Sequence, residues 1–387
     1  MLVNSARWLV LIAAAVPLAY YAAAIACALA LFGRRNQKIS DFCPPVSVLK
    51  PIHGLDRETY HNLASFCRQQ YPNYELLLCV GEVEDPAIPI IERLIAEFPQ
   101  LSVRLLIGTP TAGSNNKVAK LCRLAAEASQ ELLVASDADI RVEPDYLRRV
   151  VAPFRHERVG AVTCLYRGIT EPSLWSELQD VAITSNFIAG VLVAWKLGLR
   201  FALGATMAVR RQALAEIGGF EALANLAADD HELGKRIAAR GYRVEIAQTV
   251  AETECVARNF PGFFRYHLRR AVVTRESQSL GHLGFLFAQG LPWTIVAMAL
   301  VRSRMAAGFV AAYLALRLGV AFTVGGWGLR DPLIRRKWWL VLFDDVLGFV
   351  VWLVSLVASR VVWQGSAYNV RHGYLVPTST IKPGSSV

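Results

Sequence analysis

The sequence predicts an α/β domain with a mainly parallel sheet, flanked by an N-terminal transmembrane anchor and C-terminal transmembrane helices. Between about residues 40 and 280, short apolar runs alternate with helix-like stretches, a pattern typical of βαβ units. Apolar stretches with few charges lie before this region, at Trp8–Phe32, and after it, from Phe285 onward. We therefore expect an anchor at 1–36, a globular domain at 37–280, membrane helices at 281–360 and a tail at 361–387.

The overall composition supports membrane segments. Hydrophobic residues make up 54% of the chain and charged residues only 19%, which is apolar for a soluble enzyme. The net charge of +10 fits an anionic lipid surface and phosphate-bearing substrates. No run of Lys and Arg with interleaved aromatic residues stands out, so we expect no nucleic-acid partner. The seven cysteines form no C-x-x-C pair, which favours a reducing, cytosol-facing compartment over disulfides or zinc.

The first apolar run, Trp8–Phe32, carries no charge and is long enough to cross a bilayer with some tilt. Positive residues follow it at 34, 35 and 38, which predicts that this side faces the cytosol. A cleaved signal peptide is the alternative, although the run is long for one. We favour a membrane anchor.

Strands and helices alternate in the first half of the globular domain. In parallel sheets built this way, ligands bind beyond the carboxyl ends of the strands. The residues after each expected strand are therefore the first place to look for a site. The expected strands are Val46–Lys50, Tyr74–Val80, Leu101–Ile107 and Glu131–Ser136, and the expected helices are Glu58–Arg68, Pro86–Phe98 and Asn116–Ser129.

Polar side chains follow three of these strands. Asp85 follows the second, Asn115 and Lys117 follow the third, and Asp137 and Asp139 follow the fourth. In an extended backbone residues i and i+2 point the same way, so both carboxylates can face one ligand. Their hard oxygens suit Mg²⁺ or Mn²⁺, which usually bridges to substrate phosphates. The D-x-D pair alone could equally end a strand in solvent, but the convergence of three strand ends favours a site.

Three later stretches carry further candidates. Small residues in Phe201–Arg210 suggest close approach to a ligand or another backbone. Asp229 and Asp230 open a helix, where acidic residues also serve as ordinary capping groups. The basic, aromatic stretch Pro261–Thr274 could lie on a membrane surface, and its arginines could also bind a pyrophosphate. These last two roles are compatible.

The C-terminal membrane region leaves the number of spans open. Phe285–Val301 is barely long enough to cross, whereas Met305–Trp327 and Trp338–Val357 are longer. The basic loop at 330–337 is typical of a cytosolic loop. Asp344 and Asp345 are costly in hydrocarbon, so they should face a cavity, a partner helix or the acceptor path, or mark a break near the membrane edge.

Several ordered motifs carry a family resemblance. The chain resembles the inverting GT-A glycosyltransferases of the family 2 type, and more closely the family 21 group that holds ceramide glucosyltransferase and bacterial hopanoid-associated glycosyltransferases. The resemblance implies a Rossmann-like GT-A domain at 37–280. It also implies a multi-pass integral membrane protein with a cytosolic catalytic domain, in a bacterial inner membrane or its equivalent. The motifs are VSVLKPIHGLD at 46–56, ELLLCVGEVEDPAI at 75–88, GSNNKVAKL at 113–121, SDADIRVEPDYL at 136–147, VTCLYRG at 162–168 and GGFEALANLAADDHELGKRIAARGYR at 218–243.

The resemblance also implies roles for four acidic residues. Asp85 matches the first acidic position, which contacts the nucleotide. Asp137 matches the second, and together with Asp139 it would hold the metal and the diphosphate. Asp230, the second residue of the Asp229-Asp230 pair, matches the catalytic base.

Further residues match the donor and acceptor segments. Asn115 and Lys117 match a segment beside the donor, and Arg270 matches the Arg of the Q/R-x-x-R-W motif near the acceptor and diphosphate. This chain departs from that motif, because His267 stands at the Q/R place and Ala271 replaces the Trp. The departure points to a changed acceptor end of the site.

The implied activity is transfer of one hexose from a UDP-sugar to a lipid hydroxyl, with inversion and with Mg²⁺ or Mn²⁺ as cofactor. Ceramide is the expected acceptor, and a hopanoid accepting N-acetylglucosamine from its UDP derivative is the alternative. A non-catalytic membrane protein with a glycosyltransferase-like binding domain is a second alternative, supported only by the missing Trp. No obligate protein partner is expected.

Overall fold

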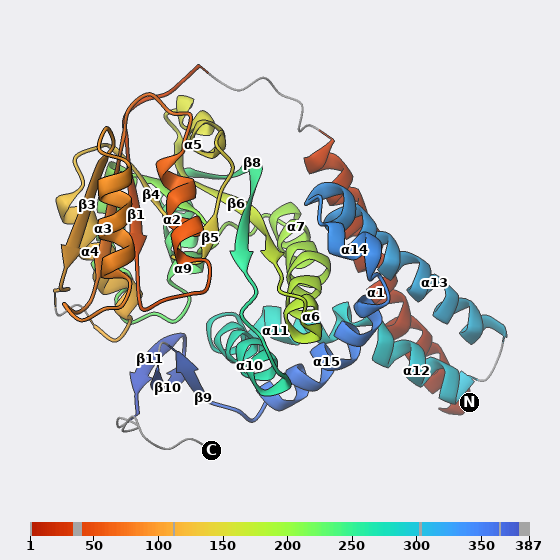
Figure 1. Cartoon of the computed structure of the whole chain (residues 1–387). Helices are drawn as coiled ribbons and strands as arrows, with labels where there is room; N and C mark the ends of the chain where they lie inside the picture. Colours follow the sequence, from red (N-terminus) through yellow and green to blue (C-terminus); the bar gives the residue numbers. More distant parts are fainter. Residues whose placement is uncertain (1, 34–40, 111–112, 302–303, 364, 379–387) are drawn as a thin grey trace. The chain divides into compact units, whose positions relative to one another are not determined.

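The computed structural model describes residues 2–33, 41–110, 113–301, 304–363 and 365–378 (Figure 1). The chain divides into two compact units, which we call the membrane unit and the sheet unit. These units interleave along the chain, whereas the segments expected from the sequence follow one another. The membrane unit comprises Met1–Asn36, Arg167–Gly198 and Cys255–Val361, and the sheet unit comprises Gln37–Tyr166, Leu199–Glu254 and Val362–Val387.

The sheet unit is built on an eight-stranded sheet with the order β3-β2-β1-β4-β7-β6-β8-β5. The four strands β3, β2, β1 and β4 are parallel, and β7 runs antiparallel to β4 and β6. The predicted α/β class is confirmed, with a parallel half and a second half that contains antiparallel pairs. The strands are β1 (Val46–Pro51), β2 (Tyr74–Val80), β3 (Ser102–Ile107), β4 (Leu132–Ala135), β5 (Ile140–Arg141), β6 (Val159–Ile169), β7 (Met207–Arg210) and β8 (Arg243–Glu254).

Mostly apolar runs explain the parallel half, because strands covered on both faces bury the side chains of both faces. Every residue of β1 is buried, and so is every residue of β2 after Tyr74. The expected helices between these strands are present. The helices of this unit are α2 (Thr59–Cys67), α3 (Ile88–Glu97), α4 (Asn116–Glu127), α5 (Tyr146–Val151), α8 (Arg211–Glu216) and α9 (Asp229–Ala239).

The C-terminal segment adds a small sheet that the sequence did not predict (Figure 1). Its strands are β9 (Arg360–Trp363), β10 (Ser366–Arg371) and β11 (Tyr374–Pro377), in the order β11-β10-β9. Two backbone hydrogen bonds join it to the loop before α9. Leu375 N donates to Asn225 O at 2.8 Å, and Ala227 N donates to Gly373 O at 2.9 Å. The tail therefore supports the loop that leads to Asp229 and Asp230.

The membrane unit is helical apart from strand ends. Its principal helices are α1 (Leu2–Phe32), α6 (Leu174–Ala182), the π-helical η2 (Ile183–Phe187), α7 (Ile188–Lys196), α10 (Phe260–Ser277), α11 (Ser279–Ala288), α12 (Gly290–Val301), α13 (Arg304–Val320), the π-helical η4 (Ala321–Gly328), α14 (Pro332–Arg336) and α15 (Leu340–Ser355). Helix α1 packs against α7, α12, α13 and η4.

Three helices among the described residues are long and apolar enough to cross a membrane. They are Trp8–Phe32, Leu174–Lys196 and Arg304–Gly328. The first and third agree with the sequence prediction. Leu174–Lys196 was not predicted, and its mean hydropathy of 1.3 is the lowest of the three because polar residues interrupt α6.

Of the other two expected spans, one is bent and the other is short. The stretch Phe285–Val301 falls across α11 and α12, which are bent by 50° and count as one candidate span only if taken together. Trp338–Val357 corresponds to α15, whose 16 residues do not reach the length of a candidate span.

Asp344 and Asp345 on α15 face partner helices, as one of the sequence alternatives proposed. Arg317 Nε on α13 lies 2.8 Å from Asp345 Oδ1, and Arg317 Nη2 lies 3.7 Å from Asp344 Oδ2. Tyr313 Oη donates to Asp345 at 2.5 Å, and Arg317 Nη1 donates to Ser185 O at 3.0 Å. These buried charges are therefore paired within the membrane unit.

Candidate active site

The D-x-D pair lies directly beyond the carboxyl end of β4. Asp137 Oδ1 lies 2.7 Å from Lys117 Nζ, and the Asp137 backbone N–H donates to Gly204 O at 3.2 Å. Asp139 Oδ2 accepts a hydrogen bond from Thr253 Oγ1 at 2.7 Å. The two carboxylates thus have separate partners, one from α4 and one from β8.

Lys117 links the D-x-D pair to helix α9. Its Nζ also lies 3.1 Å from Asp229 Oδ2, and its side chain is 10% exposed. Burial alone would lower the pKa of Lys117, but the charges of Asp137 and Asp229 outweigh burial and raise it. The ammonium group therefore stays charged between two carboxylates that come from distant parts of the chain.

Asn115 holds Lys117 in place rather than lying open to a ligand. It is fully buried, and its Oδ1 accepts from Lys117 N at 3.1 Å and from Val118 N at 3.2 Å as the N-cap of α4. Its Nδ2 donates to Leu226 O at 2.8 Å and to Asp229 Oδ1 at 3.4 Å. This amide fixes the start of α4 against the loop before α9.

The adjacent carboxylates Asp229 and Asp230 have different environments. Asp229 is 4% exposed, and burial raises its pKa to about 6 although the Lys117 charge opposes the rise. Asp230 is half-buried, and its two oxygens each accept one backbone hydrogen bond. Its Oδ2 accepts from Gly204 N at 2.8 Å and its Oδ1 from His231 N at 2.7 Å. Asp230 is therefore the accessible and oriented member of the pair.

Gly204 brings the D-x-D pair and Asp230 together. Its N–H donates to Asp230, while its carbonyl accepts from the Asp137 N–H. A Cβ at this position would lie 2.5 Å from Asp137 Oδ2 and 3.2 Å from Lys117 Nζ. Only glycine allows this close approach, in agreement with the expectation from the small residues of Phe201–Arg210.

Asp85 lies at the same edge of the sheet but has other partners. Its Oδ2 accepts from Gly54 N at 3.1 Å, and its Oδ1 accepts from Ala87 N at 2.9 Å. These bonds join the loops that follow β1 and β2. Asp85 therefore holds together the two loops beyond the first two strands.

Sequence reasoning missed two residues that the fold brings to this edge. Lys50 is fully buried at the end of β1, and its Nζ donates to Asp137 O at 2.5 Å. Burial lowers the pKa of Lys50 to about 7, against the opposing charge of Asp139. Asp56 lies in the next loop, where burial, Asp139 and Glu254 together raise its pKa to about 6. Both residues lie within the motif at 46–56, but nothing local to them indicated contact with the D-x-D pair.

His267 and Arg270 belong to α10 in the membrane unit. The Arg270 guanidinium lies 4.2 Å from the Phe187 ring centroid, and its Nη1 donates to Tyr266 Oη at 2.9 Å. Burial lowers the pKa of His267 to about 3, and the Arg270 charge adds to the shift. The residue at the Q/R place is therefore a neutral imidazole. Its Nε2 has no hydrogen-bond partner among the described residues.

The residues present fit a divalent cation that takes some of its ligands from the protein and the rest from a substrate. No group of three or more His, Cys, Asp or Glu side chains in the described part of the chain forms a complete metal cage. Asp137 and Asp139 supply hard oxygens, and Mg²⁺ is usually bound by one or two carboxylates together with substrate phosphates. Burial and the Asp137 charge raise the pKa of Asp139, and a cation between the two would relieve that repulsion.

Comparisons with known proteins identify relatives. Ceramide glucosyltransferase 1 of Caenorhabditis elegans is 30% identical over 205 residues, covering 53% of this chain and 44% of that protein. Ceramide glucosyltransferase of Gibberella zeae is 26% identical over 155 residues, covering 38% of this chain and 29% of that protein. The matches thus span less than half of these curated relatives.

A solved structure and a family model complete the comparison. The mannosyltransferase PcManGT from Pyrobaculum calidifontis, in complex with GDP-Man and Mn²⁺, is 20% identical over 88% of this chain and 99% of that chain, with a TM-score of 0.49. The model of glycosyl transferase family 21 matches residues 9–376, which is nearly the whole chain. This chain belongs to glycosyl transferase family 21.

Proposed function

We propose that this protein is an inverting glycosyltransferase that moves one hexose from a UDP-sugar to the hydroxyl of a membrane lipid, with ceramide as the acceptor. The observation that carries the proposal is the position of Asp230. Its accessible carboxylate is fixed by two backbone N–H groups beside the cluster of Lys117, Asp137 and Asp229. Family membership and the names of the curated relatives support ceramide as the acceptor.

Asp230 acts as the general base in this proposal. Each of its oxygens accepts one backbone hydrogen bond and keeps a lone pair for the acceptor hydroxyl. The carboxylate accepts the hydroxyl proton as the oxygen attacks the anomeric carbon and the bond to UDP breaks. A single displacement inverts the anomeric centre, so no covalent intermediate on the enzyme is needed.

The leaving diphosphate needs positive charge, and the cluster beyond β4 is suited to provide it. A bound Mg²⁺ or Mn²⁺ would supply charge stabilisation to the departing UDP, held by Asp137 and Asp139. Lys117 orients Asp137 through their 2.7 Å contact and contributes a fixed ammonium charge. We assign Asp85 to the nucleotide on the strength of the family motif.

The acceptor in this proposal is a membrane lipid. A lipid acceptor keeps its chains in the bilayer while its hydroxyl reaches the base, which gives the candidate spans a role in catalysis. Arg270 and the neutral His267 are assigned to the acceptor and diphosphate side. We further propose a multi-pass protein whose sheet unit faces the cytosol, because positive residues follow the first span.

The test of the proposal is a lipid extract from cells with and without the protein, read by mass spectrometry. A gain in hexosylceramide that is absent with the Asp230→Asn variant supports the proposal. A gain in a glycosylated hopanoid instead would replace ceramide as the acceptor. If no glycolipid changes while the protein is present in the membrane fraction, the proposed activity is wrong.

A further inference from the structure

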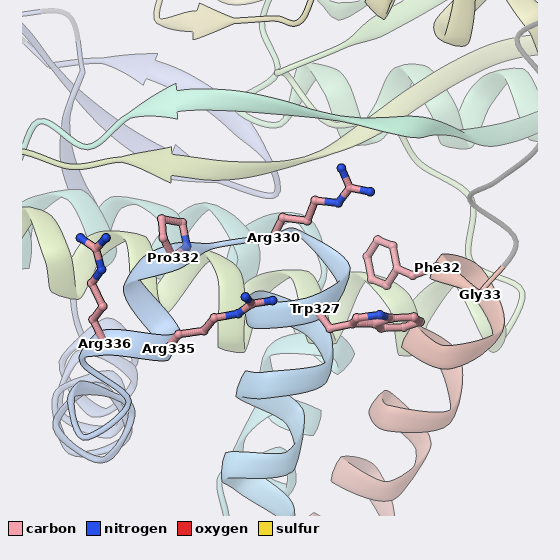
Figure 2. Close-up of a pocket in the computed structure, with 7 residues that line it drawn as sticks. All are labelled: Phe32, Gly33, Trp327, Arg330, Pro332, Arg335 and Arg336. Carbon is pink, nitrogen blue, oxygen red and sulfur yellow. The ribbon is translucent and has the colours of Figure 1, made fainter.

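A basic pocket in the membrane unit takes no part in the chemistry above. Its volume is about 730 Å³. Its three arginines come from α14 and the residue two before it, and two aromatic rings lie at the end far from Arg336 (Figure 2). The lining residues are Phe32, Gly33, Trp327, Arg330, Pro332, Arg335 and Arg336.

The pocket lies where two candidate spans end. The span Trp8–Phe32 ends at the pocket, and Arg304–Gly328 ends one residue beyond Trp327. The rings of Phe32 and Trp327 meet edge to face with centroids 6.1 Å apart. Aromatic residues at the ends of spans are typical of the membrane–water interface, and basic residues follow them on the cytosolic side. The pocket is therefore expected at the depth of the lipid head groups.

Close packing fixes the aromatic wall of the pocket. The Phe32 ring lies so near Gly328 that a Cβ on that glycine would overlap it. The fixed ring in turn supports Trp327, which is 44% exposed. An apolar surface is thus held ready beside the arginines.

The loop that carries the arginines is also fixed by hydrogen bonds. Arg167 Nη1 donates to Leu329 O at 3.1 Å and to Arg330 O at 2.6 Å, and Arg335 Nη2 donates to Gly326 O at 3.1 Å. These bonds fix the carbonyls of Gly326, Leu329 and Arg330, and within the described residues they use neither the Arg330 nor the Arg336 guanidinium group.

The acidic residue next to Arg330 has hydrogen-bond partners outside the pocket. Asp331 is 2% exposed, and its carboxylate accepts from Leu333 N at 2.8 Å and from Thr184 Oγ1 at 3.2 Å. None of the seven lining residues is acidic. Within the described ranges, none of the three lining arginines forms an ion pair with a carboxylate of this chain. The pocket thus has a positive charge that a ligand can neutralise.

We propose that this pocket binds the phosphate group of an anionic ligand, with the head group of an anionic membrane phospholipid as the expected source. Guanidinium groups bind phosphate oxygens through paired hydrogen bonds, and basic pockets beside spans on the cytosolic side favour anionic lipids. The rings of Phe32 and Trp327 offer contact to the apolar part of the same molecule. The inference does not depend on the chemistry assigned to Asp230.

The test compares two double variants of the full-length protein that lose equal charge. Arg330→Gln with Arg336→Gln removes the two pocket arginines whose side chains make no backbone bond. The control, Arg258→Gln with Arg304→Gln, removes two exposed arginines of the same unit that do not line the pocket. Native mass spectrometry of purified protein titrated with phosphatidylglycerol or phosphatidylcholine measures the bound lipid, and thermal unfolding confirms that both variants are folded.

The expected result is that the pocket variant binds phosphatidylglycerol about thirtyfold more weakly than the wild type, since the variant loses two arginines and each arginine near the surface contributes about 1 kcal/mol. The control variant and all phosphatidylcholine titrations should be unchanged. If inorganic phosphate displaces the lipid at equal concentration, the same phosphate site serves a soluble ligand. If the pocket and control variants retain phosphatidylglycerol equally, the proposal is wrong. Asp230→Asn should bind the lipid normally, which separates this result from failure of the proposed activity.

Discussion

The neighbouring residues Asp229 and Asp230 differ more in environment than in chemistry. Asp229 is buried against Lys117 and Asn115, whereas Asp230 is accessible and held by the backbone of Gly204 and His231. A buried, paired carboxylate suits a structural role, and an accessible oriented one suits proton transfer. A position at a helix start suits both residues as ordinary capping groups, and only the family resemblance singled out Asp230.

Substitution of this pair should separate the two roles. Asp230→Asn should lower the rate of transfer by about 10²–10⁴-fold, the usual contribution of a general base, while the affinity for UDP stays close to that of the wild type. Asp229→Asn should instead lower the melting temperature, because it leaves the Lys117 charge with one partner fewer. Turnover assays, calorimetric UDP binding and thermal unfolding measure these effects. Loss of UDP affinity in Asp230→Asn would show that the base has been misassigned.

Among the helices, α9 depends on a glycine for its close packing. Gly234 lies one turn after Asp230, and a Cβ there would overlap the backbone of Phe201 and Ala202. The helix can therefore pack directly on the segment that contains Gly204. This contact sets the distance between Asp230 and the D-x-D pair.

Gly234→Ala should therefore push α9 away from that segment. We expect loss of transfer activity and a melting temperature lower than that of the wild type, although alanine favours helices by up to about 1 kcal/mol over glycine. The matched control is Gly284→Ala on α11, where the added Cβ meets nothing within 4 Å and should not lower stability. Equal behaviour of the two variants in activity and unfolding would argue against the role of close packing at α9.

The C-terminal strands support the loop before α9 through backbone hydrogen bonds. Leu375→Pro removes the N–H that donates to Asn225 O, so we expect reduced turnover and faster proteolysis of the loop before α9. Val376→Ala, at an exposed position of the same strand, should leave both unchanged. Limited proteolysis with a parallel activity assay measures the effect. Wild-type turnover in Leu375→Pro would mean that the tail does not position the base.

Local periodicity predicted some elements and not others, for physical reasons. The runs that became β1 and β2 are mostly apolar, and α4 carries the Asn115 cap, so these elements could be identified locally. The span Leu174–Lys196 was missed because Glu177, Gln179 and Asp180 interrupt it, and these residues meet their hydrogen-bond partners only in the folded unit. The tail sheet was also missed: its strands pair with one another, and the bonds that join them to Asn225 and Ala227 reach a loop far away in the sequence.

The same distinction applies to the candidate site. The D-x-D pair, Asp230 and Lys117 could be named from motifs, but the ammonium bridge and the roles of Gly204 and Lys50 arise only when distant segments meet. A fully buried lysine in a strand carries no local signal of what it will contact.

A buried cluster of paired charges also holds the membrane unit together. Arg317 is 2% exposed and is shared by Asp344 and Asp345. Removing one member of a buried ion pair costs about 3–5 kcal/mol because the remaining charge is left without a partner. The cluster joins α13 to α15 and, through Ser185, to η2.

Arg317→Leu should therefore lower the melting temperature of the detergent-solubilised protein by several degrees or prevent its accumulation in membranes. Arg304→Leu, at the exposed start of the same helix, serves as the control and should have little effect. Fluorescence-detected thermal unfolding in one detergent compares them. Equal melting temperatures for Arg317→Leu and the wild type would contradict a structural role for the cluster.

We propose that the site beyond the end of β4 and at the start of α9 transfers a sugar to a lipid, with a divalent cation held by Asp137 and Asp139. The most direct measurement uses purified full-length protein with labelled UDP-glucose and ceramide in detergent, assayed with Mg²⁺ or Mn²⁺ and after removal of metal with EDTA. We expect an inverted, β-linked hexosylceramide that forms only with metal and forms again when metal is restored. Transfer at the full rate in metal-free enzyme, or a product with retained configuration, would contradict it.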